Sequence, residues 1–227
     1  MAIPALCRPI GRSGFAILLL TGLAGCGDEA AERNAFIDFL QGGIVSQRGF
    51  HLPKMTAEKA KSFGPYARHY QVILDYHQRL DAGEFAKLAP LQGLRDERLV
   101  VALATHRDDV KAAAESCPTM RAEWDRAAAT ADAAHRALQQ PPDLKRVYGS
   151  AYDKTVTQLS AQAGGLLPLM CEQLVAMVAL ADFLNSKPNM NDPEREREAN
   201  ALLEALHKHD DGIEQARRRW QAFLQGT

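Results

Sequence analysis

Apolar residues recur at spacings of three and four along most of the chain, which is the pattern of amphipathic helices. No sustained strand-like alternation of apolar and polar positions occurs. The pattern therefore predicts an all-α fold, a single bundle of about five to seven helices. Its clearest apolar stripe consists of Tyr66, Tyr70, Ile73, His77 and Leu80.

Glycine and proline divide the stripes into segments. Gly42-Gly43 and Gly164-Gly165 are each expected to end a helix, because glycine tolerates left-handed backbone. Thr56 is a predicted N-cap, and Pro65 is expected in the first turn of a new helix. Ser116-Cys117-Pro118 predicts a further helix start.

The second half of the chain has its own boundaries. Pro141-Pro142 is expected to break the chain before a helix that starts at Asp143. Pro193 is expected to open one last helix, which carries Arg217–Arg219 late in its length and whose apolar stripe reaches Phe223. Between residues 81 and 94 the pattern predicts a loosened segment at Asp81-Ala82-Gly83, followed by four apolar positions: Phe85, Leu88, Leu91 and Leu94.

Residues 166–184 form the most apolar stretch of the second half. Its length approaches that of a membrane span, but Pro168, Glu172, Gln173 and Asp182 interrupt it. We therefore expect the central helix of a bundle rather than a span.

The N-terminus has the features of a bacterial lipoprotein signal. Arg8 and Arg12 precede an apolar run from Phe15 to Gly25, which is shorter than the ~20 residues that a spanning helix needs. The run closes with Leu23-Ala24-Gly25-Cys26, which is similar to a lipobox. We expect residues 1–25 to be a cleaved signal peptide, and residues 26–227 to form one domain attached to the membrane by acyl chains on Cys26.

From this signal we expect the domain to lie in the cell envelope, facing the periplasm. Gly27 follows Cys26, and Asp28 comes one position later. Because an Asp directly after the lipidated Cys favours the inner membrane, the sequence favours the outer membrane over the inner one. The lipid anchor at Cys26 makes the membrane the one predicted partner, and an envelope protein is a further candidate partner.

Net charge and cysteine content bear on two further properties, nucleic-acid binding and disulfide formation. Removing residues 1–25 takes away two Arg from the 27 basic residues and none of the 28 acidic ones, so the mature charge is 25 − 28 = −3. This balance gives no reason to expect nucleic-acid binding. Cys117 and Cys171 remain after processing and either form one disulfide or stay as buried thiols, with equal support for each.

No constellation in the sequence predicts catalysis, a cofactor or a metal. His207 and His209 point in opposite directions on a helix, so they do not hold one ion together. His69 and His77 lie beside tyrosines, which favours hydrogen-bonded core histidines. Hydrolase and phosphate-binding motifs are absent from the sequence, so the chain is predicted not to be an enzyme.

Several blocks are similar to one family. They are Arg33–Gln41, Leu52–Glu58, Phe63–Tyr66, and Ala131–Leu138 with Asp143–Lys145, and they resemble the YiaF-type enterobacterial lipoproteins, whose domain has no known function. The resemblance covers about residues 26–80 and 127–170. It implies an envelope lipoprotein without established activity or catalytic residues to transfer, and a structural role for Asp132 beside His135 or Arg136.

Three functional hypotheses follow. The first is a non-enzymatic module that binds an envelope protein or supports envelope integrity. The second is a module that binds a lipid or small apolar ligand between the 166–184 helix and its neighbours; an apolar cavity there would favour it, and a solid core would exclude it. The third is a hydrolase in which His69 or His77 meets a carboxylate and a nucleophile.

Overall fold

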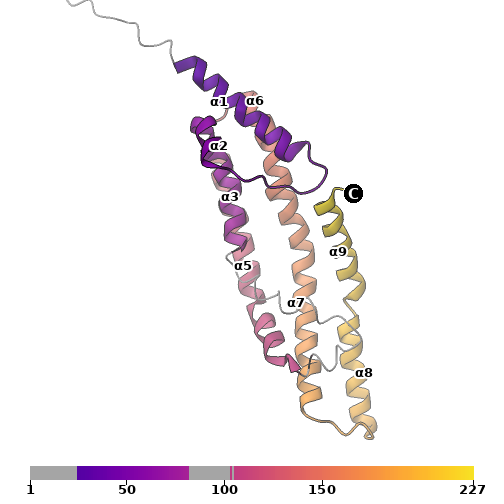
Figure 1. Cartoon of the computed structure of the whole chain (residues 1–227). Coiled ribbons are helices and arrows are strands. Elements are labelled where there is room, and N and C mark those ends of the chain that lie inside the picture. Colours follow the sequence, from indigo (N-terminus) through magenta and orange to yellow (C-terminus); the bar gives the residue numbers. More distant parts are fainter. Residues whose placement is uncertain (1–24, 82–102, 104) are drawn as a thin grey trace, which may run out of the picture.

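The computed structural model describes residues 25–81, residue 103 and residues 105–227. Over these residues the regular structure is entirely helical, as the sequence predicts, and the helices form an elongated bundle (Figure 1). The predicted signal peptide up to Ala24 and the apolar positions of residues 85–94 lie outside the described residues.

The structure describes eleven named helical segments. In chain order they are α1 (Gly25–Leu40), the π-helical turn η1 (Gln41–Val45), α2 (Ala57–Ser62), the 3-10 turn η2 (Gly64–Tyr66), α3 (Ala67–Asp81), α5 (Arg107–Ala137), α6 (Pro142–Tyr152), the π-helical turn η4 (Asp153–Thr157), α7 (Gln158–Asn185), α8 (Pro193–His207) and α9 (Asp210–Gln225).

One continuous helix forms the spine of the bundle. Segments α6, η4 and α7 run without a break over Pro142–Asn185, 44 residues, or about 66 Å at 1.5 Å per residue. By length and composition this helix could cross a membrane. Within the described fold, α7 lies between α5 on one side and α8 and α9 on the other (Figure 1), the place expected of a central bundle helix.

The prediction that Gly164-Gly165 ends a helix is wrong. Both glycines lie inside α7, and so does Pro168. Buried Ala163 and Leu167 flank the glycine pair on the face that packs against the neighbouring helices. Burial of this face outweighs the roughly 1 kcal/mol cost of each helical glycine.

The predicted helix start at Ser116-Cys117-Pro118 is wrong for a similar reason. These residues lie in the middle of α5, which is 31 residues long. Apolar side chains are buried on both sides of the proline, with Val110 and Ala113 before it and Met120 and Trp124 after it. Continuous packing on this face compensates for the backbone hydrogen bond that Pro118 lacks.

Two other boundaries differ from the sequence prediction. Gly42-Gly43 does not end the first helix, since η1 continues to Val45 and buries Ile44. Gly43 instead permits a close approach, because a Cβ there would lie 2.9 Å from the Pro53 ring. The last helix is two helices, α8 and α9, and α7 fixes the break between them through Glu172–His209 and Gln173–Asp210 contacts of 3.2 and 2.9 Å.

Several local predictions are confirmed. The Thr56 hydroxyl accepts a hydrogen bond from the Lys59 amide at the start of α2. Pro65 lies in the first turn of η2, and Pro142 opens α6 after the predicted break. Asp192, which the sequence analysis did not identify as a cap, accepts a hydrogen bond from the Glu194 amide at the start of α8.

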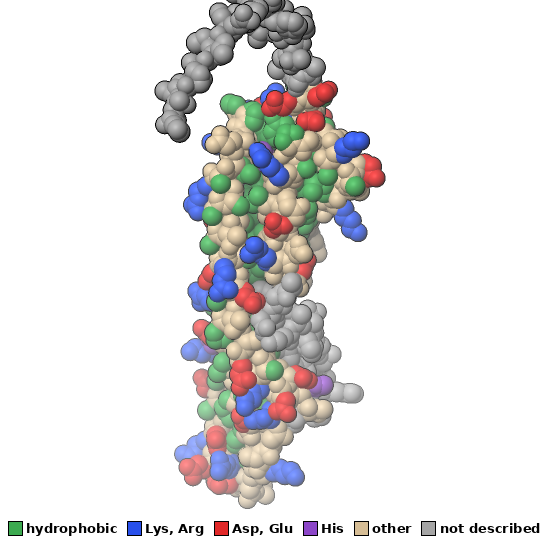
Figure 2. Space-filling model, turned by 90° about the vertical axis from the view of Figure 1, so that its left-hand side faces the viewer, with side chains coloured by type: hydrophobic (Ala, Val, Ile, Leu, Met, Phe, Trp, Pro, Cys, Tyr) green, Lys and Arg blue, Asp and Glu red, His purple; other side chains and the backbone are tan. Residues whose placement is uncertain are grey.

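Buried apolar side chains form two cores along the bundle. The first core joins α1, α3, the C-terminal part of α5 and α6, and includes Phe36, Tyr70 and Tyr148. The second core joins the N-terminal part of α5, α7 and α8, and includes Met120, Leu174 and Leu206. On the face seen in Figure 2, charged side chains of both signs are scattered along the bundle, and apolar side chains gather over its upper half.

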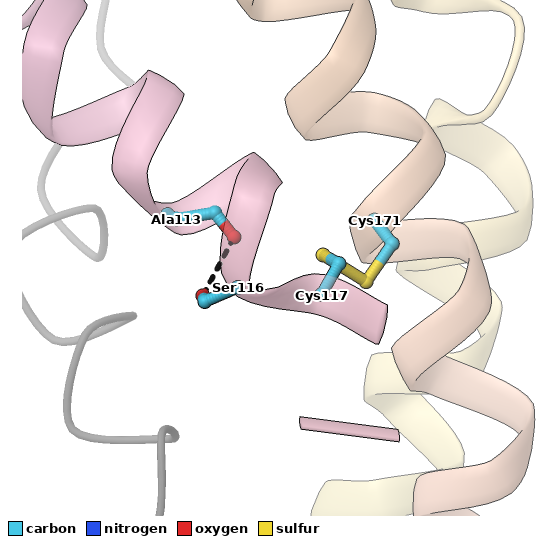
Figure 3. The surroundings of a disulfide bond; sticks show 4 residues. All are labelled: Ala113, Ser116, Cys117 and Cys171. Atoms are coloured by element: carbon cyan, nitrogen blue, oxygen red, sulfur yellow. Dashed lines mark hydrogen bonds between the residues drawn. A yellow bond between two sulfur atoms is a disulfide. The ribbon is translucent and has the colours of Figure 1, made fainter. Parts of the chain in front are cut away.

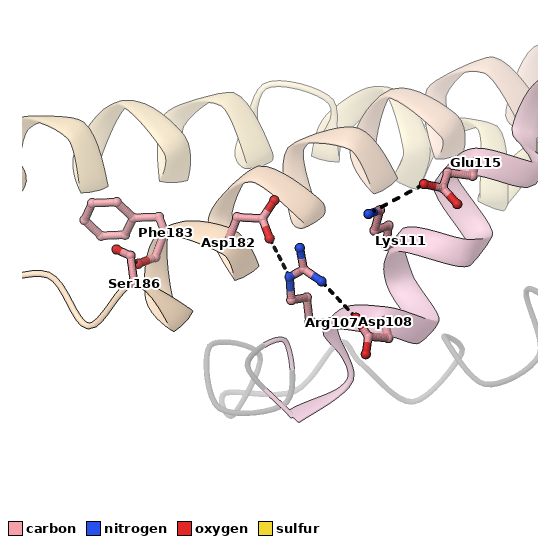
Figure 4. Close-up of polar contacts among 7 residues, drawn as sticks. All are labelled: Arg107, Asp108, Lys111, Glu115, Asp182, Phe183 and Ser186. Carbon is pink, nitrogen blue, oxygen red and sulfur yellow. Dashed lines mark hydrogen bonds and ion pairs between the residues drawn. The ribbon is translucent and has the colours of Figure 1, made fainter.

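Covalent and ionic contacts join α5 to α7 beside the second core. Cys117 and Cys171 form a disulfide with a Cα–Cα distance of 5.8 Å (Figure 3). Near the start of α5, the Arg107 guanidinium contacts Asp182 of α7 at 2.5 Å and Asp108 at 2.8 Å (Figure 4). Because the ionic groups are partly exposed, the disulfide is the stronger link.

Replacing both cysteines with alanine should lower the free energy of unfolding by about 4 kcal/mol. The disulfide closes a loop with a sequence separation of 54, and this loop restricts the unfolded chain. Urea unfolding of the oxidised protein with and without the two substitutions measures the difference. Equal stabilities, or a reductant that leaves the unsubstituted protein unchanged, would contradict the prediction.

Candidate functional site

An apolar cavity lies against α7 where α3, α5 and α9 approach it. Its volume is about 410 Å³, within the range of roughly 300–1,000 Å³ typical of small-molecule sites. It is open on one side. The lining residues are Phe50, His77, Leu80, Asp81, Trp124, Leu159, Ala163, Leu166, Leu167, Met170, Trp220 and Leu224.

Helix α7 supplies one wall of the cavity. Its lining residues begin at Leu159 and continue through Ala163, Leu166, Leu167 and Met170. These spacings of three and four place them on one face of the helix. The small Ala163 side chain leaves room opposite the larger residues of the neighbouring helices.

The cavity borders the first core. Trp124, Leu159 and Ala163 belong to that core, and Phe50, Leu80 and Trp220 pack against it. None of the described lining residues belongs to the second core.

The end of α9 and the segment after η1 form the rim. The Phe50 ring centroid lies 5.9 Å from that of Phe223 and 5.4 Å from that of His77. The Phe50 amide donates a hydrogen bond to the Leu224 carbonyl at 3.1 Å. Gly226 ends α9 in a left-handed conformation with φ 71°, and its close contact with the Arg48 carbonyl leaves no room for a Cβ.

His77 is one of two ionisable residues in the lining. Its Nε2 lies 3.0 Å from the Thr155 carbonyl oxygen, so this nitrogen is placed as a hydrogen-bond donor. Burial lowers the pKa of the imidazole, although the Thr155 carbonyl and the Asp81 carboxylate act in the opposite direction. The neutral ring is therefore the favoured form near pH 7.

The other predicted core histidine, His69, is remote from this lining and 1% exposed. Its Nδ1 lies 3.1 Å from the Gln140 side-chain nitrogen, and its carbonyl accepts the Tyr148 hydroxyl at 2.8 Å. Burial lowers its pKa. The hydrogen bonds described for His69 and His77 are core contacts, as predicted. Asp81 lies in the same lining as His77, and no nucleophilic side chain is hydrogen-bonded to either ring in the described contacts.

The other histidine and aspartate residues singled out from the sequence lie in helices or at helix ends. His207 ends α8 and Asp211 belongs to α9, while His209 contacts Glu172. Over the residues that the structure describes, no three His, Cys, Asp or Glu side chains are grouped to hold a metal. Asp132 accepts a hydrogen bond from the Tyr152 hydroxyl at 2.6 Å, and the His135 ring lies 4.1 Å from the Tyr152 ring.

The predicted lipid-attachment residue and the disulfide lie in different parts of the bundle. Cys26 lies in the first turn of α1, at the end of the bundle where the described chain begins (Figure 1). The disulfide of Cys117 and Cys171 lies further along the bundle, and Cys171 directly follows the cavity residue Met170. The sequence hypothesis of an apolar site beside the 166–184 helix includes one wall of the cavity, with Leu166, Leu167 and Met170. The other contributors were not predicted, because Phe50, Trp124 and Trp220 lie in distant segments whose apolar stripes indicated only a core.

Replacing His77 with glutamine should make stability less dependent on pH. Below the ordinary pKa of 6.5, His77 takes up a proton in the unfolded chain before it does so in the folded one, where its pKa is lowered. The unfolded state then binds more protons, so stability is lost as pH falls, by at most about 1.4 kcal/mol per pH unit for one group.

Urea unfolding between pH 7.5 and pH 5 checks this expectation, with the unsubstituted chain measured in parallel. The H77Q variant should lose less stability on acidification. Parallel curves for the two proteins, or a steeper loss in the variant, would contradict the assignment of a neutral His77.

Comparisons with known proteins identify a family whose function is unknown. Residues 14–221 match the family model described as "Protein of unknown function (DUF3053)". The chain is 32% identical over 171 residues to the "Uncharacterized protein YiaF" of Escherichia coli K12, covering 74% of this chain and 72% of that protein. The YiaF protein of Shigella flexneri has the same identity and coverage. No solved structure matches the chain. The chain belongs to the DUF3053 family and is of the YiaF type, as its sequence blocks predict.

Proposed function

We propose that this chain is a lipid-anchored envelope protein that binds an apolar ligand in the cavity between α3, α5, α7 and α9. The cavity is the observation that carries the proposal. Of the three functional hypotheses, only the ligand-binding one requires an apolar cavity beside the 166–184 helix. The leading hypothesis from sequence, a protein-binding or envelope-support module, has no comparably specific feature in the described residues.

The lining suits an apolar ligand energetically. Ten of its twelve residues have apolar or aromatic side chains, and the two others are His77 and Asp81. Each methylene group that leaves water for such a site contributes about 0.8 kcal/mol. An alkyl chain or a small ring system is therefore a fitting occupant.

Two further observations support the envelope location. The Cys117–Cys171 disulfide is typical of proteins in oxidising compartments such as the periplasm. Cys26 lies at the start of α1, which is itself packed into the domain through Phe36 and Leu40. A lipid on Cys26 would therefore hold the bundle directly at the membrane surface, without a long linker.

Cys26→Ser should abolish acyl labelling of the chain and release it from membranes. The thiol of Cys26 is the atom to which the lipid would be attached, and one serine hydroxyl does not replace it. Metabolic labelling with an alkyne fatty acid, followed by membrane fractionation, measures both effects. Cys117→Ser is the matched control and should remain labelled; labelling of the C26S chain would contradict the anchor.

Filling the cavity should abolish ligand binding. Ala163→Phe places a ring where the lining has only a methyl group, whereas Ala161→Phe adds the same ring at an exposed position of α7. We expect the first variant to bind decanol at least tenfold more weakly than the unsubstituted chain and the second to bind it normally.

Intrinsic fluorescence is a direct readout for this titration. The chain contains two tryptophans, Trp124 and Trp220, and both line the cavity. The protein is the processed chain of residues 26–227 with Cys26→Ser, which avoids detergent and keeps the helical contacts described above. Failure of decanol to bind, or equal binding by the A163F and A161F variants, would contradict the proposed function.

A further inference from the structure

The polar part of the cavity lining is negative. Asp81 is the one carboxylate in the lining, and no lysine or arginine occurs among its residues within the described part of the chain. Asp81 is the last described residue of α3. Its carboxylate supplies the negative charge of the lining.

His77 does not offset this charge near neutral pH. Its Nε2 is engaged by the Thr155 carbonyl at 3.0 Å, and burial favours the neutral imidazole. The electrostatic effect of Asp81 on His77 places the carboxylate near this ring. The only charge that the described lining presents to a ligand is therefore that of Asp81.

Aromatic side chains in the lining favour the same ligand charge. Phe50, Trp124 and Trp220 line the cavity together with Asp81. The faces of such rings attract cations, and tryptophan does so most strongly. A ligand carboxylate or phosphate would instead meet the like charge of Asp81.

We propose that the cavity selects amphiphiles with a cationic head group, such as alkylammonium compounds, over fatty acids of the same chain length. The alkyl chain packs along the α7 wall of Ala163 and Leu167, and the head group lies at Asp81. This inference rests on the proposed function, since it names the ligand class of the same cavity.

Three probes with the same alkyl chain separate the head-group preference from apolar binding. They are decyltrimethylammonium, decanol and decanoate, each titrated below its micellar concentration at pH 7.5 into the processed chain with Cys26→Ser. Tryptophan fluorescence reports the cavity, and calorimetry gives an independent dissociation constant. We expect decyltrimethylammonium to bind about tenfold more tightly than decanoate, with decanol between them.

Asp81→Asn removes the charge and nearly preserves the size of the side chain. It should reduce the preference for the cation over decanoate severalfold and leave decanol binding unchanged. Asp75→Asn is the matched control, because Asp75 lies on α3 and is hydrogen-bonded to Gln71, outside the lining. This control should keep the full preference.

The outcomes distinguish this inference from the proposed function. If decanol binds but decanoate binds as tightly as the cation, or if the D81N variant keeps the full preference, the cationic ligand class is wrong and the apolar site stands. If none of the three probes binds, the proposed function fails and this inference fails with it. If the A163F variant still binds the cation, binding lies outside the cavity and the assignment is overturned.

Discussion

The packing of a single long helix is the constraint on which the rest of the structure depends. The spine formed by α6, η4 and α7 is too long for one compact core to surround, so it packs against different partners along its length. Near its start it meets α1 and the C-terminal part of α5; further along it meets the N-terminal part of α5, α8 and α9. The two cores are a consequence of this length, and the cavity borders the first of them.

This arrangement also relates the covalent features to the cavity. The disulfide joins α5 to α7 one residue beyond Met170, so it fixes the separation of the two helices that provide Trp124 and Ala163. The close contact of Gly226 with the backbone at Arg48 fixes the rim. A cavity held in this way is formed before a ligand arrives, which reduces the ordering cost of binding.

The sequence predicted the fold class because amphipathic periodicity is a local signal. It also predicted the Thr56 cap and the break at Pro141-Pro142, which depend on a few neighbouring residues. It failed at Gly164-Gly165 and at Pro118, where tertiary burial outweighs local propensity. The sequence could only suggest an apolar site beside the 166–184 helix. It could not identify the opposite side of the cavity, since Phe50, Trp124 and Trp220 are apolar residues of ordinary stripes and only their long-range arrangement leaves space between them.

A crystal structure of the processed chain with a bromine-tagged alkylammonium compound would locate the ligand, because anomalous scattering identifies the bromine position without reference to any assumed pose. We expect one bromine site within the lining formed by Trp124, Ala163, Leu167 and Trp220, with the ammonium group beside Asp81. A bromine site elsewhere on the bundle, for example at exposed Val175, together with a cavity filled by protein side chains, would contradict it.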